Sequence, residues 1–451
     1  MTKIQEPTLF RKKDFEDFRY QQFLVTDIGK LYQVIPFEEL AKLLPKNKSK
    51  VGARAWFNYE GYFGLMFLKA YLGLSDEKLI RRINTDWALQ MFCGIRLGIN
   101  ESIKDEDIPS RVRMFLGRNL DIETFQQVFI NHWKANMDNT QCFMNDATVY
   151  ESYIKYPTDV KLLWDCCIWL YEQLHILHKE SHLPKPRSKY KEQCVRQMEY
   201  SKTRKKTYKQ TQRRRKALLY LLNKGIKLWE DLSINESFVS NIELPDDWYN
   251  KIMVIKEIYR QQLYMYENRT NIIPHRIVSL FKPYLRPIVR GKENKQVEFG
   301  MKVMISQVDG INLIDKLSFD PYNESKYLKS SIIKHKRRFG ACYQIGVDQI
   351  YGTNENRKYM NKSNIYHCLV RKGKPSIYEH QYHKLREHIG LERATRLEGS
   401  FGNEKNHYTL RKIKARCKET EIIWALFGIM TANAVRMSNK INNQDVIKQV
   451  A

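Results

Sequence analysis

Apolar residues in the first third of the chain recur at helical spacing, with little alternation of the kind that marks strands. The stretch YEGYFGLMFLKAYLGLSDEKLIRRINTDWALQMFCGI predicts an apolar helix that ends near Gly73. Ser75 then predicts the N-cap of a second helix, which turns apolar residues inward and basic residues outward. We therefore expect an all-helical N-terminal domain over residues 1–140. Its short helices and basic outer faces fit either a helix-turn-helix-like DNA-binding module or an ordinary small helical bundle.

The pattern changes to alternation in the second half. The segment QVEFGMKVMISQVDGINLIDKLSF is rich in β-branched and aromatic residues, and Asp309-Gly310 predicts a type I′ hairpin turn within it. Shorter strand patterns cover residues 141–151, 342–352 and 365–373. Helical patterns lie between these strands. The order predicts an α/β fold in which helices pack on a mixed sheet.

A long basic segment interrupts this pattern after the first strand. Residues 185–216 carry fourteen Lys and Arg against two Glu, with tyrosines interleaved, and the whole chain has a formal charge of +27. A solvated basic linker and a surface that tracks DNA phosphates both fit such a run; the basic chain as a whole favours DNA. We expect residues 159–285 to form a basic helical insertion.

Composition narrows the compartment and the chemistry. The eight cysteines are scattered, and none forms a CxxC pair or has zinc-finger spacing with histidine. The N-terminus lacks the apolar core of a secretory signal, and the longest apolar run is too short to cross a bilayer. We expect a cytoplasmic protein with free thiols, no structural zinc and no membrane partner.

Three acidic residues fall on separate elements of the predicted sheet region. Asp146 lies in the first strand, Asp348 follows a strand, and Glu398 lies in a helical segment beside Gly399 and Gly402. Converging carboxylates without zinc-type ligands suit a hard cation such as Mg²⁺. Each acid also has a structural alternative, namely a turn cap for Asp146, a helix-cap contact for Asp348 and a surface pair with Lys405 for Glu398.

Five blocks of sequence occur in the order found in the DDE-class transposases of bacterial insertion sequences. They are NDATVYESYIKYPTDVKLLWD, RPIVRGKENKQVEFGMKV, DGINLIDKLSFDPYNES, GVDQIYGTNENRKYM and RLEGSFGNEKNHYTLRKIKAR. The chain thus resembles the insertion-sequence-five superfamily and its relatives. Residues 20–135 are similar to the helical domain that precedes the catalytic core in that family.

The resemblance implies a ribonuclease-H-like mixed-sheet catalytic core, built from residues 141–158 and 286–440, followed by a tail at 441–451. It implies that Asp146, Asp348 and Glu398 hold Mg²⁺, for which Mn²⁺ can substitute, and catalyse two-metal hydrolysis and transesterification of phosphodiesters. The implied partners are double-stranded DNA, as inverted-repeat ends and target, and a second copy of the chain in a homodimer on DNA. The implied location is the bacterial nucleoid.

Cations around these elements are candidates for DNA contact. The candidates are Arg396, Lys405, Arg411, Lys412, Arg204, Lys205, Lys206, Arg213, Arg214, Arg215, Arg81, Arg82, Arg111 and Arg113. A related family pattern has tyrosine and arginine seven and four residues before the glutamate, where this chain has Leu391 and Ala394. Arg393 and Arg396 are the nearest arginines, and we assign the role to Arg396. The alternatives to a transposase are a transposase-derived DNA-binding protein without catalysis and a non-mobile nuclease of the same core fold.

Overall fold

The structure is a computed structural model that describes residues 12–45, 55–98, 100–180, 184, 187–234, 245–289, 297–375 and 377–450. The chain divides into two compact units. The first contains residues 1–153, 301–318 and 322–451, and the second contains residues 154–300 and 319–321. Each unit is described by itself.

The N-terminal part of the first unit is helical, as predicted. Its helices are α1 (Lys12–Val25), α2 (Asp27–Gln33), α3 (Phe37–Ala41), α4 (Tyr59–Leu72), α5 (Asp76–Thr85), α6 (Trp87–Phe92), α7 (Ile108–Asn119) and α8 (Ile122–Trp133), with a short 3₁₀ turn at Lys134–Asn136. The Ser75 hydroxyl accepts a hydrogen bond from the Lys78 backbone N–H, which confirms the predicted N-cap of α5. Side chains of Thr26, Asn58, Asp86 and Asp121 cap four other helices in the same way.

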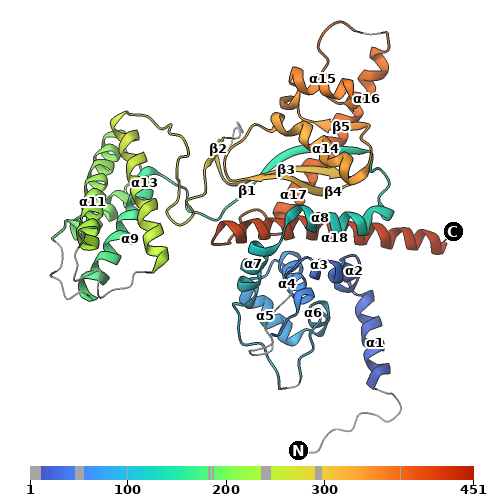
Figure 1. Ribbon diagram of the computed structural model, residues 1–451, viewed down its shortest axis with the longest axis horizontal. Helices are drawn as coiled ribbons and strands as arrows, with labels where there is room; N and C mark the ends of the chain where they lie inside the picture. Colours follow the sequence, from blue (N-terminus) through green and yellow to red (C-terminus); the bar gives the residue numbers. More distant parts are fainter. Residues whose placement is uncertain are drawn as a thin grey trace, which may run out of the picture. The chain divides into compact units, whose positions relative to one another are not determined.

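These helices share their core with the last helix of the chain, α18 (Lys418–Val450). The ring of Phe427 packs against those of Phe63, Phe67 and Phe125, with centroids 5.1 to 6.2 Å apart. Phe63 and Phe125 also stack on each other at 5.9 Å, so α4, α8 and α18 bury one aromatic cluster. Figure 1 shows α18 running between the N-terminal helices and the sheet. The predicted N-terminal domain is therefore part of the same compact unit as the sheet. The residues expected to form a C-terminal tail continue α18 as far as Val450.

The sheet is mixed. Its strands are β1 (Cys142–Glu151), β2 (Pro287–Val289), β3 (Val297–Val308), β4 (Ile311–Ser318), β5 (Gln344–Val347) and β6 (Tyr366–His367). The order is β2-β3-β1-β5-β6, with β4 paired to β3; β1, β5 and β6 are parallel, whereas β3 and β4 are antiparallel. Asp309 and Gly310 both have positive φ, at 48° and 82°, as the predicted type I′ turn requires. The two later strands, β5 and β6, are shorter than predicted. β5 ends at Val347 because Asp348 caps a 3₁₀ turn (Gln349–Tyr351), and β6 has two residues.

Helices cover both faces of the sheet (Figure 1). After β4 come a 3₁₀ turn (Glu324–Tyr327) and α14 (Leu328–Phe339), and after β5 comes α15 (Asn354–Lys362). One continuous helical stretch then contains α16 (Glu379–Glu392), a π-helical turn (Arg393–Leu397) and α17 (Glu398–His407). Alternate β1 side chains contact different helices: Phe143 stacks on His335 of α14, whereas Asp146 and Thr148 contact the stretch from α16 to α17.

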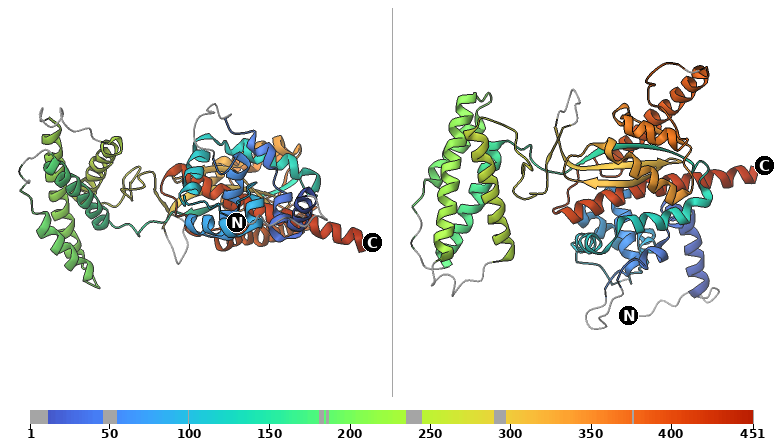
Figure 2. Two further views of the ribbon diagram at one scale, coloured as in Figure 1. Left: turned by 90° about the horizontal axis from the view of Figure 1, so that it is seen from below. Right: turned by 45° about the horizontal axis from the view of Figure 1, so that its top comes forward.

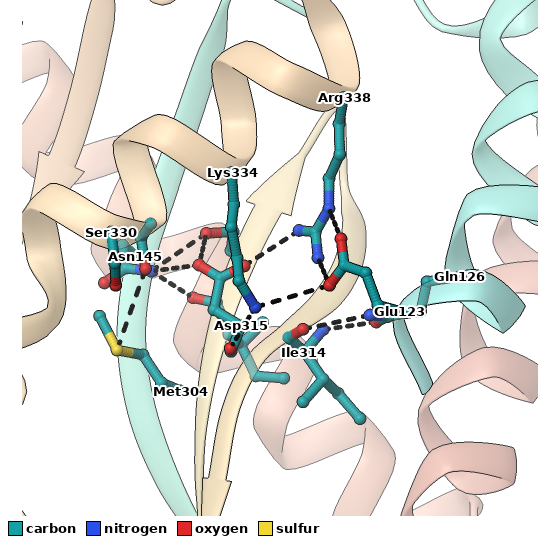
Figure 3. Close-up of polar contacts among 12 residues, drawn as sticks. Glu123, Gln126, Asn145, Met304, Ile314, Asp315, Ser330, Lys334 and Arg338 are labelled. Carbon is teal, nitrogen blue, oxygen red and sulfur yellow. Dashed lines mark hydrogen bonds and ion pairs between the residues drawn. The ribbon is translucent and has the colours of Figure 1, made fainter. Parts of the chain in front are cut away.

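A buried polar network ties the sheet to α14 and α8. Arg338 donates to Asp315 of β4 at 3.0 Å and to Glu123 of α8 at 2.8 and 3.1 Å (Figure 3). Asp315 in turn accepts hydrogen bonds from Ser306 and Asn145. The side chains of Arg338 and Asp315 are each 2% exposed, so these charges are paired out of contact with water.

The second unit contains a helical bundle, and the strand β2 and the first residues of β3 also belong to this unit. Its helices are α9 (Asp159–Glu180), α10 (Tyr190–Lys202), α11 (Tyr208–Ile234) and α13 (Asp246–Glu267). Leucines of α9 and α11 and isoleucines of α13 form its core, with Tyr171 and Trp229 among them. Figure 2 shows the long helices of this bundle packed side by side from two directions. Among the described residues, no helix is both long and apolar enough to cross a bilayer.

Candidate active site

The first predicted acid, Asp146, lies in the middle of the central strand β1. Its side chain is 17% exposed. The pKa of Asp146 is raised to about 6, mainly by burial and to a smaller extent by the nearby Glu324 and Asp348 charges, against the lowering effects of the Ala147 backbone N–H and Arg393. Negative charge therefore accumulates around a partly desolvated carboxylate.

The second acid, Asp348, lies beside Asp146 at the end of the neighbouring parallel strand. Asn145 of β1 pairs in register with Val347, the last residue of β5. Asp146 directly follows Asn145 and Asp348 directly follows Val347, so the two acids are neighbours across the strands. Asp348 is exposed, and its carboxylate accepts a 2.6 Å hydrogen bond from the Gln349 N–H as it caps the 3₁₀ turn. The structure thus brings the first two acids to one place at the carboxyl end of β5, where sites in α/β sheets commonly form.

The third acid, Glu398, reaches this place through an arginine. Arg393 Nη1 donates to Asp146 Oδ2 at 2.9 Å, and Arg393 Nη2 lies 3.8 Å from Glu398 Oε1. Arg393 opens the π-helical turn, and Glu398 follows its last residue. Such turns are rare and occur frequently at functional sites. Glu398 itself is 62% exposed. In the described parts of the chain, no three His, Cys, Asp or Glu side chains are grouped closely enough to hold a metal ion.

Two functional candidates were missed or ranked too low by sequence reasoning. Glu324 is 8% exposed, pairs with Lys302 at 2.6 Å and raises the pKa of Asp146. It lies in the third of the five family-like blocks, which was the available signal. Arg393 contacts the acids, whereas Arg396 pairs with Glu392 of its own helix. Arg396 also lines a pocket of about 310 Å³ beside the first residues of β1 and β5.

Lys405 lies on the same face of β1 as Asp146. Its ammonium donates to the Thr148 hydroxyl at 2.9 Å and lies over the Tyr150 ring. Because Asp146 and Thr148 are two residues apart in a strand, Arg393 and Lys405 contact successive positions along one face. Lys405 therefore lies two residues further along β1 than the contact between Arg393 and Asp146.

The glycines beside Glu398 do not serve close packing within the protein. A Cβ atom built at Gly399 or Gly402 meets nothing within 4 Å. The sequence offers close approach of the helix to the sheet and to a DNA backbone as the reason for these glycines. The described part of the protein makes no close approach on this side, and the DNA part of the expectation stays a prediction. The helix does not begin after Gly402, because the helical stretch runs without a break from α16 through Glu398 to His407.

The other predicted DNA contacts differ in accessibility. Arg411, Lys412, Arg204, Lys205, Lys206 and Arg213 are exposed. Arg81, Arg82 and Arg111 are exposed but paired with acidic neighbours on the N-terminal helices. Buried positions need a correction: Arg113 is 5% exposed and pairs with Asp76 against the Trp424 ring, and Arg214 is 6% exposed and donates to Gln193 and Gln197. Arg215 is also buried. These three side chains do not lie on an outer surface.

Comparison with known protein families finds a match in the N-terminal helices. Residues 19–114, which contain α2 to α6 and the first half of α7, match the family model described as a transposase domain (DUF772). No curated protein and no solved structure matches the chain. The N-terminal helices are thus similar to a domain of transposases, and this likeness supports a transposase family for the chain independently of the three carboxylates.

Proposed function

We propose that the chain is a DDE-class transposase with a ribonuclease-H-like core, which binds the inverted-repeat ends of an insertion sequence and cleaves and joins DNA strands. The observation that carries the proposal is the meeting of Asp146 and Asp348 on adjacent parallel strands, with Glu398 linked to them by Arg393. The strand order, with β1 between an antiparallel pair and two parallel strands, supports the fold assignment. The match at residues 19–114 supports the transposase assignment.

The donor chemistry of this place fits Mg²⁺ or Mn²⁺. All three predicted ligands are carboxylates, and a bound hard cation would offset the burial that is the main cause of the raised pKa of Asp146. Arg393 supplies the positive charge there in this structure. We propose that Asp146 and Asp348 hold the cation and that Glu398, whose exposed side chain has room to turn, completes the site. A divalent cation bound there supplies Lewis-acid activation of water and of the 3′-hydroxyl group.

The chain's own residues would position the DNA. Lys405 lies beside the acids, and the open side of Gly399 and Gly402 admits a phosphate backbone close to the helix. Exposed cations of the bundle, namely Arg204, Lys205 and Arg213, would add salt-dependent affinity for phosphates. A transposase must hold two element ends together, so we propose a homodimer on DNA.

The decisive experiment is a cleavage and joining assay on linear DNA that carries the element's own ends. Asp146→Asn, Asp348→Asn and Glu398→Gln should each reduce Mg²⁺-dependent cleavage on the order of 1000-fold, because each removes part of a metal site worth several kcal/mol to the transition state. Glu387→Gln is the matched control, since Glu387 is 68% exposed on α16 and pairs only with His383 among the contacts described. Mobility shifts should show that all four variants still bind the ends.

The same assay separates the alternatives. A DNA-binding protein without catalysis would shift the ends and leave them intact in Mg²⁺. A non-mobile nuclease would cleave them and join nothing. Full cleavage by any one of the three acid variants would remove that residue from the proposed triad.

A further inference from the structure

The second unit contains a pocket that lies at the beginnings of its two longest helices. Its volume is about 700 Å³. Residues from the first turns of α9 and α11, the last turns of α10 and the loop after α13 line it. It belongs entirely to the bundle, so it is separate from the carboxylates of the sheet.

A buried guanidinium lines this pocket, and two of its nitrogens are without hydrogen bonds in the described part of the chain. Arg215 is 4% exposed, and among the described residues neither its Nε nor its Nη2 has a hydrogen-bond partner. Its closest charged neighbour is Asp159, whose Oδ2 lies 3.5 Å from Nη2, beyond a well-formed hydrogen bond. The adjacent Arg214 is equally buried but donates three hydrogen bonds, at 2.6, 2.7 and 2.9 Å. Arg214 is thus satisfied by the protein, whereas Arg215 retains unused donors that point to a ligand.

The charge around Arg215 favours an anion. Arg276, Lys161 and Lys206 also line the pocket, and Asp159 is the one carboxylate in its described lining. Asp159 is already occupied, since it accepts from Arg276 at 2.7 Å and from Gln262 at 3.1 Å. Four cations therefore face one carboxylate, and the pocket has a surplus of positive charge.

Two helix N-termini add to this charge. α9 begins at Asp159 and has 22 residues, and α11 begins at Tyr208 and has 27 residues. The backbone N–H groups and dipoles at helix N-termini attract phosphate. Ser201 and Thr211 line the same pocket, but their hydroxyl groups donate to the backbone carbonyls of Gln197 and Thr207, so the positive charge comes from the cations and the helix N-termini.

We propose that this pocket binds a phosphate monoester, with Arg215 and Arg276 as its guanidinium ligands and Lys206 at its mouth. Planar guanidinium groups match the oxygens of a phosphate and form charge-assisted hydrogen bonds with it. The source of the phosphate is either a free nucleotide or the 5′-terminal phosphate of a DNA strand. This inference does not rest on the proposed strand cleavage, because none of its residues belongs to the carboxylate site.

The test uses the full chain and measures binding by calorimetry and by the shift in melting temperature. The probes are inorganic phosphate, a nucleoside 5′-monophosphate, and one oligonucleotide with either a 5′-phosphate or a 5′-hydroxyl group. We expect the wild type to bind inorganic phosphate and the monophosphate, with sulfate at equal ionic strength giving a weaker response. A 5′-phosphorylated oligonucleotide that binds more tightly than both the monophosphate and its 5′-hydroxyl counterpart identifies a DNA end as the source. Otherwise a free nucleotide is the source.

The variants separate this pocket from general attraction by the basic bundle. Arg276→Gln and Lys206→Gln should each weaken phosphate binding by about tenfold or more, since each removes a charged donor. Lys216→Gln is the matched control, because Lys216 is exposed, follows Arg215 directly and lies outside the pocket lining. Arg215→Gln should abolish binding; if it fails to fold, the Arg276 and Lys206 variants still decide. The proposal is overturned if the wild type gives no phosphate response, or if Lys216→Gln weakens binding as much as the two pocket variants do.

Discussion

The guanidinium of Arg393 is bonded to the carboxylate of Asp146 at 2.9 Å, across 247 residues of sequence. Gly346 eases this approach, because a Cβ atom built there would lie 3.3 Å from the Arg393 Cβ and would crowd it. The contact joins the central strand to the π-helical turn that precedes Glu398. It therefore sets the position of the helix that carries the third acid relative to the strand that carries the first.

The first prediction concerns the cost of keeping Asp146 ionised. The pKa of Asp146 is raised from 3.8 to about 6 by burial, so at pH 7 its charged form destabilises the folded state. Asp146→Asn removes this charge, but its single amide oxygen can accept from Arg393 or from the Ala147 N–H and not from both. We expect the relief of desolvation to outweigh that lost bond and to stabilise the protein by about 1 kcal/mol at pH 7. Urea denaturation of the two proteins at pH 7 measures this gain.

The control for this prediction is Asp348→Asn. Asp348 is exposed, so replacing it relieves no comparable desolvation and should give little change in stability. A loss of stability in Asp146→Asn, measured under the same conditions, would show that the ionised carboxylate contributes to the fold. Such a loss would contradict the expectation that the ionised Asp146 carboxylate lowers the stability of the folded protein.

The second prediction concerns the buried network on the other face of the sheet. Arg338→Met leaves Asp315, which is 2% exposed, without its charged partner (Figure 3). Breaking a buried ion pair from one side typically costs about 3–5 kcal/mol. We expect a loss of that size in the free energy of unfolding for Arg338→Met. Asp315→Asn combined with Arg338→Met should be more stable than the sum of the two single losses implies, because the two residues are directly coupled. Strict additivity of the two changes would contradict the pairing.

Local features of the sequence predicted local features of the fold. The Ser75 cap and the Asp309-Gly310 turn depend on residues within a few positions, and both are confirmed. The lengths of β5 and β6 were overestimated. β5 ends where Asp348 caps a 3₁₀ turn, and the alternation of apolar and polar residues does not predict that change from strand to turn. The π-helical turn has no sequence pattern that we used, and the choice between Arg393 and Arg396 depends on it.

The site was predictable only as far as single residues carry chemistry. The approach of Asp146 to Asp348 depends on strand pairing across about 200 residues, and Glu398 is linked to Asp146 only through the long-range contact of Arg393; residue spacing encodes neither relationship. The count of basic residues also gave no sign that Arg214 is buried. Its guanidinium donates hydrogen bonds to Gln193 and Gln197 on a different helix. Burial of a cation is a tertiary property, and a basic run in the sequence does not reveal it.

The third prediction concerns pH and a buried acid behind Lys405. Burial raises the pKa of Glu404 from 4.5 to about 7, although Tyr150 and Asn312 donate hydrogen bonds to it. The folded state therefore binds this proton more tightly than the unfolded state does, and the cost of the charged form is relieved as pH falls from about 7 toward 4.5. Glu404→Gln has no such proton. We expect its stability advantage over the wild type to be largest above pH 7 and to shrink between pH 7 and 4.5.

Thermal melts of both proteins across this pH range measure the difference. Comparison of the two cancels the titration of other acids, which is common to both. A stability difference that does not change with pH would show that Glu404 keeps an ordinary pKa in the folded protein.

The fourth prediction uses the two glycines beside Glu398. Both lie within α17, and a methyl group at either position meets nothing in the protein within 4 Å. Alanine is favoured over glycine in a helix by about 1 kcal/mol, so Gly399→Ala and Gly402→Ala should each stabilise the protein by up to that amount. If a DNA backbone passes along this side of the helix, the same methyl groups will obstruct it. We therefore expect higher melting temperatures together with weaker binding and slower cleavage of DNA ends.

Gly390→Ala on α16 is the matched control for this prediction. A Cβ atom at Gly390 lies 3.8 Å from Cys368, which is an ordinary contact, so this change should alter stability without altering DNA binding. Equal DNA affinity in all three variants would place the DNA elsewhere, and the stability measurements would confirm that the variants had folded.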